Sequence, residues 1–340
     1  MKKHKLAIVG LGMALKPHLQ SLQELADRVE IAACFTPSEA RRRAFAEAHS
    51  YPLTPSLEAI LDDRTIDIVA VLTPPNTHLP LVEQCAAAGK HVLIEKPIEG
   101  TLESARAAVE VMERARRKFG VVLQHRFRKA SRRLAGLVQA GDLGALVSGS
   151  AAIRWWRPPE YFAQPGRGMK GRDGGGVLLT QAIHTLDLFQ SLAGPIARVA
   201  AFATTSPSRK IDTEDIVGAG IEFANGAVGT IDATTVAFPG FPERIELAGE
   251  KATAVLAAET LEIFYRDGRH VLEKGGPSKS GGADPMAFSH EAHMALITDF
   301  LDAIDEDREP IVSGREALKV QVLIEALLRS ASESRAVEVR

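Results

Sequence analysis

The sequence predicts a protein of two parts: a parallel, doubly wound α/β sheet over residues 1–124, then an α+β part over residues 125–340. In the first part, short apolar stretches alternate with helical patterns, which favours parallel strands joined by crossover helices. In the second part, strand-like stretches follow one another with hairpin turns between them. That pattern favours a large, mostly antiparallel open sheet packed on helices.

Composition limits the class of protein. The chain has 340 residues, which is enough for two cores, with 45% apolar and 25% charged residues. The net charge of −2 argues against nucleic acid or an anionic membrane as partner, and no apolar run is long enough to cross a bilayer. Cys34 and Cys85 lie in apolar surroundings, so we expect reduced thiols and a cytoplasmic protein. Metal-ligand spacings such as C-x-x-C or H-E-x-x-H are absent, which predicts no metal site.

The first strand, Lys5 to Val9, runs directly into Gly10-Leu11-Gly12, and leucines then recur at helical spacing. A strand, a glycine turn and a helix are the context of a dinucleotide fingerprint, because glycine lets the backbone approach a pyrophosphate at the helix N-terminus. Leu15 replaces the third glycine of the motif, so a tight turn without a ligand is the alternative. The cofactor contacts predicted here are Gly10, Gly12, Met13 and Ala14.

The second strand, Val29 to Phe35, ends without the acidic residue that binds a ribose 2′-hydroxyl in NAD-preferring proteins. Thr36 and Ser38 follow instead, with Arg41 on the next helix. A hydroxyl near an arginine suits a 2′-phosphate, so NADP is slightly favoured over NAD. The alternative is a solvated basic helix face.

Two further strands end in proline-containing segments. Asp67 to Leu72 runs into Thr73-Pro74-Pro75-Asn76-Thr77-His78, and the strand that begins at His91 runs into Glu95-Lys96-Pro97. Proline has no N–H for a neighbouring strand, so each strand stops there. Lys96 is therefore placed at a carboxyl end, where ligands bind in open α/β sheets, although an ordinary surface lysine is the alternative. A helix that begins at Thr101 and a strand at Val121 to Leu123 complete the first part.

These motifs, together with Gln124-His125-Arg126-Phe127, resemble the Gfo/Idh/MocA family of nicotinamide-dependent oxidoreductases. The resemblance implies a Rossmann domain over residues 1–124 and a domain for substrate binding and oligomerisation over residues 125–340. It also implies a homodimer or homotetramer formed through the open face of the second sheet. The further cofactor contacts expected are Thr73, Pro74, Asn76, His78, Glu95, Lys96 and Gln124.

The second part begins with a linking helix over Ala130 to Ala140. The stretches with strand character are Val147 to Trp156, Ala197 to Ala203, Asp215 to Phe223, Ala227 to Val236, Arg244 to Ala248 and Ala252 to Ala257. Asn225-Gly226 and Asp267-Gly268 are hairpin signals. Pro277 to Pro285 reads as a mobile loop. His290, His293 and Asp299 fall on an ordinary surface or interface helix, and the last helix spans about Arg315 to Ser332.

A helix over Gly176 to Leu192 interrupts the strands. Thr180, His184 and Asp187 fall at i, i+4 and i+7, which places them on one helical face. A core histidine satisfied by a neighbour is the alternative to a functional one. The Gly-rich lead-in resembles the substrate-site helix of the family, but Thr180 replaces the usual acid and Ala182 the usual glycine, which puts the substrate in doubt.

Aromatic and basic residues precede that helix. Trp155 and Trp156 point to opposite faces if both are in a strand, so one is expected in the core. Flat rings cover the C–H faces of sugars, and a guanidinium binds hydroxyls or a carboxylate. The predicted substrate-binding residues are Lys96, Arg126, Trp156, Tyr161, Arg167, Thr180 and His184.

The predicted function is hydride transfer between NAD(P) and a sugar-like or cyclitol-like alcohol or ketone. The catalytic residues are Lys96 and His184: His184 takes the hydroxyl proton, and Lys96 stabilises the charge on the same oxygen. Asp187 orients His184 or is a packing residue. One alternative is an NADPH-dependent reductase of a keto sugar or another carbonyl. The other is a dinucleotide-binding regulator that has lost catalysis.

Overall fold

The computed structural model describes residues 3–275 and 289–340. The chain packs as two units: residues 1–122 with 289–318, and residues 123–288 with 319–340. The predicted mobile loop at Pro277 to Pro285 lies outside the described residues. None of the described helices combines the length and the apolar character that a bilayer crossing requires.

The first unit is built on a parallel sheet of six strands in the order β3-β2-β1-β4-β5-β6. Its strands are β1 (His4–Val9), β2 (Val29–Phe35), β3 (Leu53–Thr54), β4 (Ile68–Val71), β5 (His91–Glu95) and β6 (Phe119–Val122). The order reverses between β1 and β4, and ligands bind at such a switch point in open α/β sheets. The predicted parallel sheet is confirmed, and the two-residue β3 is an addition that no hydrophobic pattern indicated.

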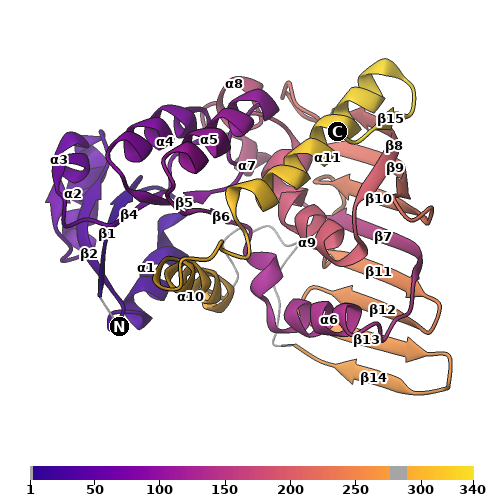
Figure 1. Cartoon of the computed structure of the whole chain (residues 1–340). Helices are drawn as coiled ribbons and strands as arrows, with labels where there is room; N and C mark the ends of the chain where they lie inside the picture. Colours follow the sequence, from indigo (N-terminus) through magenta and orange to yellow (C-terminus); the bar gives the residue numbers. More distant parts are fainter. Residues whose placement is uncertain (1–2, 276–288) are drawn as a thin grey trace. The chain divides into compact units, whose positions relative to one another are not determined.

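Helices cover both faces of this sheet, with α4 and α5 on one face and α1 and α10 on the other (Figure 1). The helical segments of the connections are α1 (Leu15–Glu24), α2 (Glu39–Ala48), α3 (Glu58–Asp62), the 3₁₀ turn η1 (Pro75–Thr77), α4 (His78–Ala87) and α5 (Leu102–Arg114). Polar caps begin two of them: Ser38 accepts the Arg41 N–H, and Thr101 accepts the Ser104 N–H.

Residues 289–318 belong to the first unit, although the sequence analysis assigned them to the second. Helix α10 (Glu291–Asp305) packs on α1, and the Val121 N–H donates to the Val312 carbonyl beside β6. A Cβ at Gly120 would lie 2.6 Å from the Phe300 ring, so only glycine fits under this helix. Helical periodicity shows that a face is apolar but not which sheet it covers, which explains the difference. His293 on this helix is 3% exposed, so it is a core residue.

The second unit contains a sheet of nine strands in the order β14-β13-β12-β11-β7-β10-β9-β8-β15. Its strands are β7 (Leu146–Arg154), β8 (Ile196–Thr204), β9 (Ile216–Phe223), β10 (Val228–Thr234), β11 (Arg244–Gly249), β12 (Ala252–Ala257), β13 (Thr260–Tyr265), β14 (His270–Glu273) and β15 (Val337–Glu338). All neighbours are antiparallel except β7 and β10. The predicted mostly antiparallel sheet is confirmed.

One face of this sheet is covered by helices α6 and α9 (Figure 1). The helical segments are η2 (Gln124–Phe127), α6 (Lys129–Gln139), α7 (Pro159–Phe162), α8 (Lys170–Asp173), the π-helical η3 (Leu178–Ala182) and α9 (Ile183–Ala193). Helix α11 (Gly314–Glu333) begins in the first unit and continues in the second. The α9 side chain Phe189 packs edge-on against Phe223 of β9, with 5.8 Å between ring centroids.

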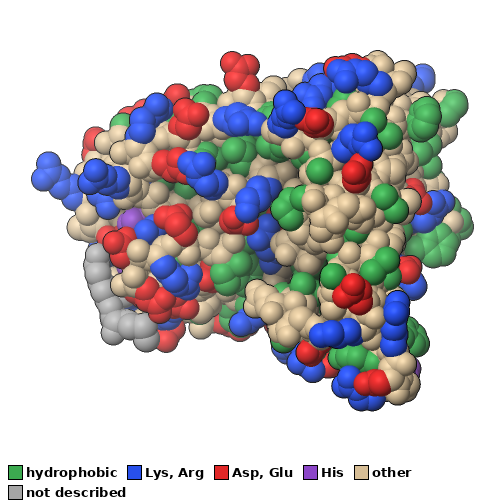
Figure 2. All heavy atoms as spheres, turned by 45° about the vertical axis from the view of Figure 1, so that its right-hand side comes forward, with side chains coloured by type: hydrophobic (Ala, Val, Ile, Leu, Met, Phe, Trp, Pro, Cys, Tyr) green, Lys and Arg blue, Asp and Glu red, His purple; other side chains and the backbone are tan. Residues whose placement is uncertain are grey.

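The opposite face of the sheet is open and carries exposed apolar side chains. Phe202 and Val228 are 85% and 62% exposed, and the strand register puts them on the same face as Phe264 and Leu272. Figure 2 shows hydrophobic side chains at the edge of the view where this sheet lies. Small residues such as Gly218 and Gly220 fill the middle of this face, which leaves it flat. The same face also carries the exposed ion pairs Arg154–Asp232 and Arg198–Glu222, so it is an open surface of mixed apolar and charged side chains.

Candidate active site

The glycine turn of the first unit has the geometry that a dinucleotide requires. Gly10 has a φ of +107°, and a Cβ there would lie 2.7 Å from the Leu72 backbone, so only glycine is accommodated. A Cβ on Gly12 would meet nothing within 4 Å. Met13 is 46% exposed, and α1 begins two residues later. The turn therefore leaves open space in front of a helix N-terminus, and contact of its residues with a cofactor stays a prediction.

The three arginines that follow β2 make different contacts. Arg42 donates to the Thr36 carbonyl at 2.5 Å, and Arg43 pairs with Glu39 one turn earlier in α2. Arg41 is exposed, and no described carboxylate pairs with its side chain. Ser38 uses its hydroxyl to cap α2. Of the three residues predicted to contact the cofactor at the end of β2, Thr36 is buried, Ser38 caps α2, and Arg41 has an exposed side chain that a ligand can reach.

The segment after β4 is tied to the segment after β5 by a buried histidine. His78 Nε2 lies 2.9 Å from the Thr73 carbonyl, and Nδ1 lies 3.1 Å from the Pro97 and Ile98 carbonyls. Its side chain is fully buried, and burial lowers the pKa of this histidine. Pro74 and Asn76 in the same segment are exposed. His78 therefore fastens two loops together, whereas Pro74 and Asn76 face outward.

Strand β5 delivers Glu95 and Lys96 to the carboxyl edge of the sheet. The Glu95 carboxylate accepts the Lys96 N–H through Oε2 at 3.3 Å, and its Oε1 lies 2.7 Å from His18 Nε2. Neighbouring positive charge and the His18 hydrogen bond lower the pKa of Glu95 against the opposing effect of its burial. Lys96 is half-buried. Glu95 therefore points into the first unit toward α1, and Lys96 is the residue at the strand end with a long basic side chain.

In the second unit, His184 on α9 is 9% exposed and stacks on His125 of η2, with ring centroids 5.0 Å apart. Arg126, also in η2, donates to both carboxylate oxygens of Asp187 at 2.7 and 2.6 Å. This bidentate ion pair joins η2 to α9 and engages both Arg126 and Asp187. Gln124, predicted to contact the cofactor, is buried in the same turn. The sequence analysis did not select His125, although it lies inside the quoted Gln-His-Arg-Phe motif.

The helix that carries His184 begins with a π-helical turn, which contains Thr180. The Thr180 hydroxyl donates to the Gly176 carbonyl at 2.7 Å and lines a small cavity, whereas His184 lies against His125. That Thr180 and His184 share one helical face stays a prediction. Turns of the π-helical kind are frequent at functional sites.

That cavity in the second unit brings together three of the predicted substrate residues. Tyr161, Arg167 and Thr180 line it, together with Gln181 and Glu214. The Arg167 guanidinium lies over the Tyr161 ring at 4.9 Å, and Gln181 donates to the Tyr161 hydroxyl at 2.9 Å. Trp156 does not line the cavity; it is half-buried and packs edge-on against Phe238. Trp155 is buried, as expected for one of the two tryptophans.

Glu214 is a residue of this cavity that the sequence analysis missed. Its carboxylate accepts the backbone N–H groups of Gly176 and Leu178, both at 3.1 Å. Burial raises the pKa of Glu214. A Cβ on Gly176 would lie 1.9 Å from the Glu214 carbonyl oxygen, so glycine is required for the helix to begin here. A single acid in a loop has no spacing signal, which explains why the sequence did not reveal it.

Comparisons with known proteins agree with these two halves. Residues 4–123 match a family model described as the Gfo/Idh/MocA oxidoreductase family with an NAD-binding Rossmann fold. Residues 131–255 match the model of the GFO/IDH/MocA C-terminal domain. The two models thus follow each other along the chain in the order of the two folded sheets.

Individual proteins are similar over nearly the full length. A D-apiose dehydrogenase of Paraburkholderia graminis is 28% identical, over 100% of this chain and 91% of its own length. An inositol 2-dehydrogenase of Rhizobium meliloti is 28% identical, over 98% of this chain and 99% of its own. The WlbA dehydrogenase of Bordetella pertussis, solved with NADH and UDP-GlcNAcA, is 26% identical with a TM-score of 0.86, and the match covers 100% of this chain and 99% of that one. Because both family models match and dehydrogenases align end to end, this protein belongs to the Gfo/Idh/MocA family of oxidoreductases.

Proposed function

We propose that the protein transfers a hydride between NAD(P) and a sugar-like or cyclitol-like alcohol or ketone, with Lys96 and His184 acting on the reacting oxygen. The observation that carries this proposal is Lys96 at the carboxyl end of β5, next to the switch point of a sheet that matches an NAD-binding family model. The relatives named above act on a sugar and a cyclitol, which supports the substrate class.

The glycine turn fits a dinucleotide. The open position beside Gly12 leaves room for a pyrophosphate, and the following helix supplies N–H groups and a positive dipole end. When bound, the cofactor supplies a nicotinamide ring that accepts or donates hydride. Thr36, Thr73 and Lys96 all follow strands of the same sheet, so their segments lie at the edge where the cofactor would extend.

Cofactor choice depends on the end of β2. Thr36 is buried and carries no charge that would repel a 2′-phosphate, and the exposed Arg41 is available to pair with one. The other two arginines have partners inside the first unit. We therefore propose that NADP is accepted as well as NAD, because a guanidinium binds a phosphate through charge-assisted hydrogen bonds.

The substrate side belongs to the second unit. Tyr161, Arg167, Thr180 and Gln181 bring hydroxyl, guanidinium and amide groups to one cavity, and such groups suit a polyhydroxylated molecule. Glu214 supplies a carboxylate to the same cavity, where Thr180 replaces the acid usual for the family. We propose that these residues decide which sugar-like substrate is accepted.

In the oxidative direction, His184 takes the proton of the substrate hydroxyl. Imidazole suits this task because its ordinary pKa lies near neutral pH. Lys96 donates a hydrogen bond to the same oxygen and stabilises the negative charge that develops on it, so the carbon-bound hydrogen leaves as hydride. Asp187 orients the η2 turn beside His184 through its ion pair with Arg126. In the reductive direction, His184 returns this proton to the oxygen, and Lys96 again stabilises the negative charge that develops on it.

The open sheet face supports self-association. Phe202 and Phe264 are exposed on strands β8 and β13 of one flat face, with Val228 on β10 between them in the strand order. Burying two aromatic rings and an aliphatic side chain favours association by several kcal/mol at about 25 cal/mol per Å². We propose a homodimer or homotetramer through this face. Light scattering of Phe202→Glu should show smaller particles, and Ile311→Glu, at an exposed position of the first unit, is the matched control.

The experiment that tests the activity is a turnover screen. Purified protein is mixed with sugars, cyclitols, uronates and nucleotide sugars in the presence of NAD⁺ or NADP⁺, and the corresponding ketones are mixed with the reduced cofactors. Nicotinamide absorbance reports turnover in both directions. We expect at least one substrate class to be turned over; a protein that binds the cofactor but turns over none of them would contradict the proposal.

A further inference from the structure

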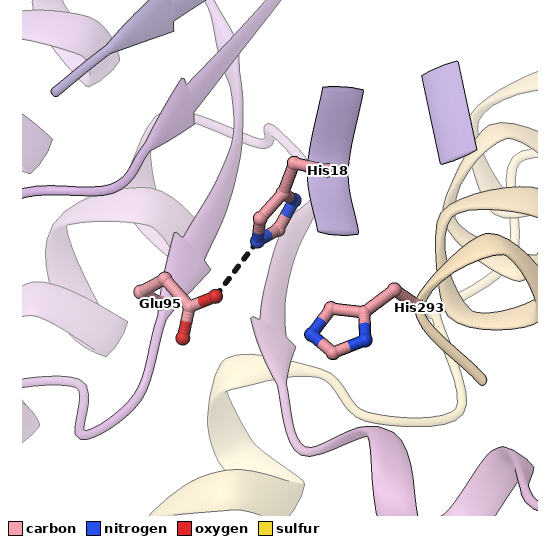
Figure 3. Close-up of side chains that lie close together, drawn as sticks. All are labelled: His18, Glu95 and His293. Carbon is pink, nitrogen blue, oxygen red and sulfur yellow. Dashed lines mark hydrogen bonds and ion pairs between the residues drawn. The ribbon is translucent and has the colours of Figure 1, made fainter. Parts of the chain in front are cut away.

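Three side chains that neither the cofactor turn nor the substrate cavity uses converge inside the first unit. They are His18 of α1, Glu95 at the end of β5, and His293 of α10 (Figure 3). One potential ligand atom from each lies within 4.8 Å of the others. The side chains of His18 and Glu95 are 1% and 13% exposed, and His293 is buried. All three residues belong to the first unit.

Within the cluster, His18 contacts both of the other residues. His18 Nε2 lies 2.7 Å from Glu95 Oε1, so a hydrogen bond joins the two groups. The His293 ring meets the His18 ring edge-on, with 5.4 Å between centroids. Figure 3 shows the ring of His293 with one nitrogen turned toward the Glu95 carboxylate. The cluster thus offers two imidazoles and one carboxylate around a common space.

We propose that His18, Glu95 and His293 bind one divalent transition-metal ion, with Zn²⁺ as the expected occupant. Two histidines and a carboxylate form a ligand set that Zn²⁺, Co²⁺ and Fe²⁺ accept, and a fourth position remains for water. No spacing motif predicts this site, because the ligands lie 77 and 198 positions apart, on separate elements that meet only in the folded unit.

The movement that coordination requires is small. Tetrahedral zinc with bonds of about 2.0–2.2 Å places its ligand atoms about 3.3–3.6 Å apart. His18 Nε2 and Glu95 Oε1 must therefore separate slightly from 2.7 Å, and the widest pair must close from at most 4.8 Å. His18 Nδ1 has no hydrogen-bond partner among the described residues, so the ring is not held on its other side and can shift.

A bound ion would act on the strand end that carries Lys96. Glu95 Oε2 accepts the Lys96 N–H, so a metal that holds this carboxylate also holds the backbone from which the lysine extends. The ion would join α1, β5 and α10, and α10 is the helix that returns to the first unit from a distant part of the sequence. The proposed role is therefore structural, and it does not depend on the substrate or on hydride transfer.

The test is a metal titration of the full-length protein after treatment with a chelator. Co²⁺ should produce the visible absorption of a tetrahedral His- and carboxylate-ligated site, with one ion per chain, and Zn²⁺ should abolish it by competition. Zn²⁺ should also raise Tm in a concentration-dependent way, because it binds the folded state alone. Absence of both the Co²⁺ spectrum and the Zn²⁺-dependent rise in Tm would overturn the proposal without any variant.

Variants locate the ion. His293→Leu and Glu95→Gln should each weaken Co²⁺ binding at least about tenfold. His4→Asn is the matched control: His4 is a buried histidine of the same unit that lies 2.8 Å from Asp305, outside the cluster, and its loss should leave Co²⁺ binding unchanged. Unchanged Co²⁺ binding in both cluster variants, or weakening equal to that in the control, would also overturn the assignment.

Discussion

The two units place their polar groups by different means. In the first unit, the candidate cofactor residues follow directly after parallel strands, and backbone conformation does most of the positioning, as at Gly10. In the second unit, side chains position one another. Arg126 forms an ion pair with Asp187, and Gln181 donates a hydrogen bond to Tyr161. The Glu214 carboxylate accepts the Gly176 N–H where the helix begins. Backbone positioning leaves motifs in the sequence, whereas side-chain networks vary with the ligand. The difference therefore explains why the candidate cofactor residues could be predicted from motifs and the contacts of the second unit could not.

The largest effect should come from removing one catalytic group from each unit. Lys96→Met or His184→Ala should reduce kcat by about 10²-fold or more, the usual scale for loss of a proton-transfer or charge-stabilising group. Cofactor affinity should change little in His184→Ala. Because both groups act in one transition state, the double variant should lose less than the product of the two single losses.

Steady-state kinetics and cofactor titration check this prediction. Lys274→Met and His270→Ala are matched controls, because both residues are exposed near β14. Near-normal kcat in either single variant would refute the shared role of Lys96 and His184. Losses that multiply fully in the double variant would mean that the two groups act in separate steps.

The second-largest effect is expected in the first unit, where the choice between NAD and NADP is proposed to depend on the Arg41 side chain. Arg41→Ala should weaken NADP binding by roughly 10- to 100-fold, because a charge-assisted hydrogen bond contributes about 1.5–3 kcal/mol, and it should leave NAD binding almost unchanged. Fluorescence titration with both cofactors measures the two affinities. Arg43→Ala is the control, since Arg43 already pairs with Glu39. Equal changes for NAD and NADP would show that Arg41 does not contact the 2′-phosphate.

A smaller effect tests the side-chain network of the second unit. Gly176→Ala places a methyl group 1.9 Å from the Glu214 carbonyl oxygen, so the helix start must move. Overpacking of this kind costs about 1–3 kcal/mol, and we expect a lower Tm together with a higher KM for substrate. Gly171→Ala is the control, because a Cβ there meets nothing within 4 Å. A Gly176→Ala protein with the Tm and KM of the parent would show that the Glu214 cap is dispensable.

The smallest effect concerns the pH dependence of the first unit. Burial, with Arg117 nearby, lowers the pKa of His91 to about 4, and His91 Nδ1 accepts the Lys118 N–H at 2.9 Å. Between pH 6.5 and 4, His91 is protonated in the unfolded chain but neutral in the folded chain. The free energy of unfolding therefore decreases as the pH falls through that window. The free energy of unfolding should be about 1–2 kcal/mol lower at pH 5 than at pH 7 from this group, the lower end reflecting solvent screening of the half-buried ring. Urea denaturation at both pH values measures it, and His91→Asn should show a weaker dependence on pH; an unchanged dependence would exclude His91 as the source.

The sequence alone determined those features that depend on local pattern. Strand-glycine-helix, strand-proline and hairpin signals act within a few residues, so both sheets, the position of Lys96 at a strand end and the family resemblance could be predicted, and the fold and the family are confirmed. Burial of one tryptophan of the adjacent pair and of both cysteines could also be predicted, because side-chain alternation and apolar surroundings are local too.

Only the tertiary structure decided which distant residues meet. The return of α10 to the first unit, the ion pair between Arg126 and Asp187, the placement of Glu214 under Gly176, and the convergence of His18, Glu95 and His293 all join segments far apart in the chain. The physical reason is that such contacts depend on how helices and loops pack over a sheet, and packing is decided by the whole set of side chains at once.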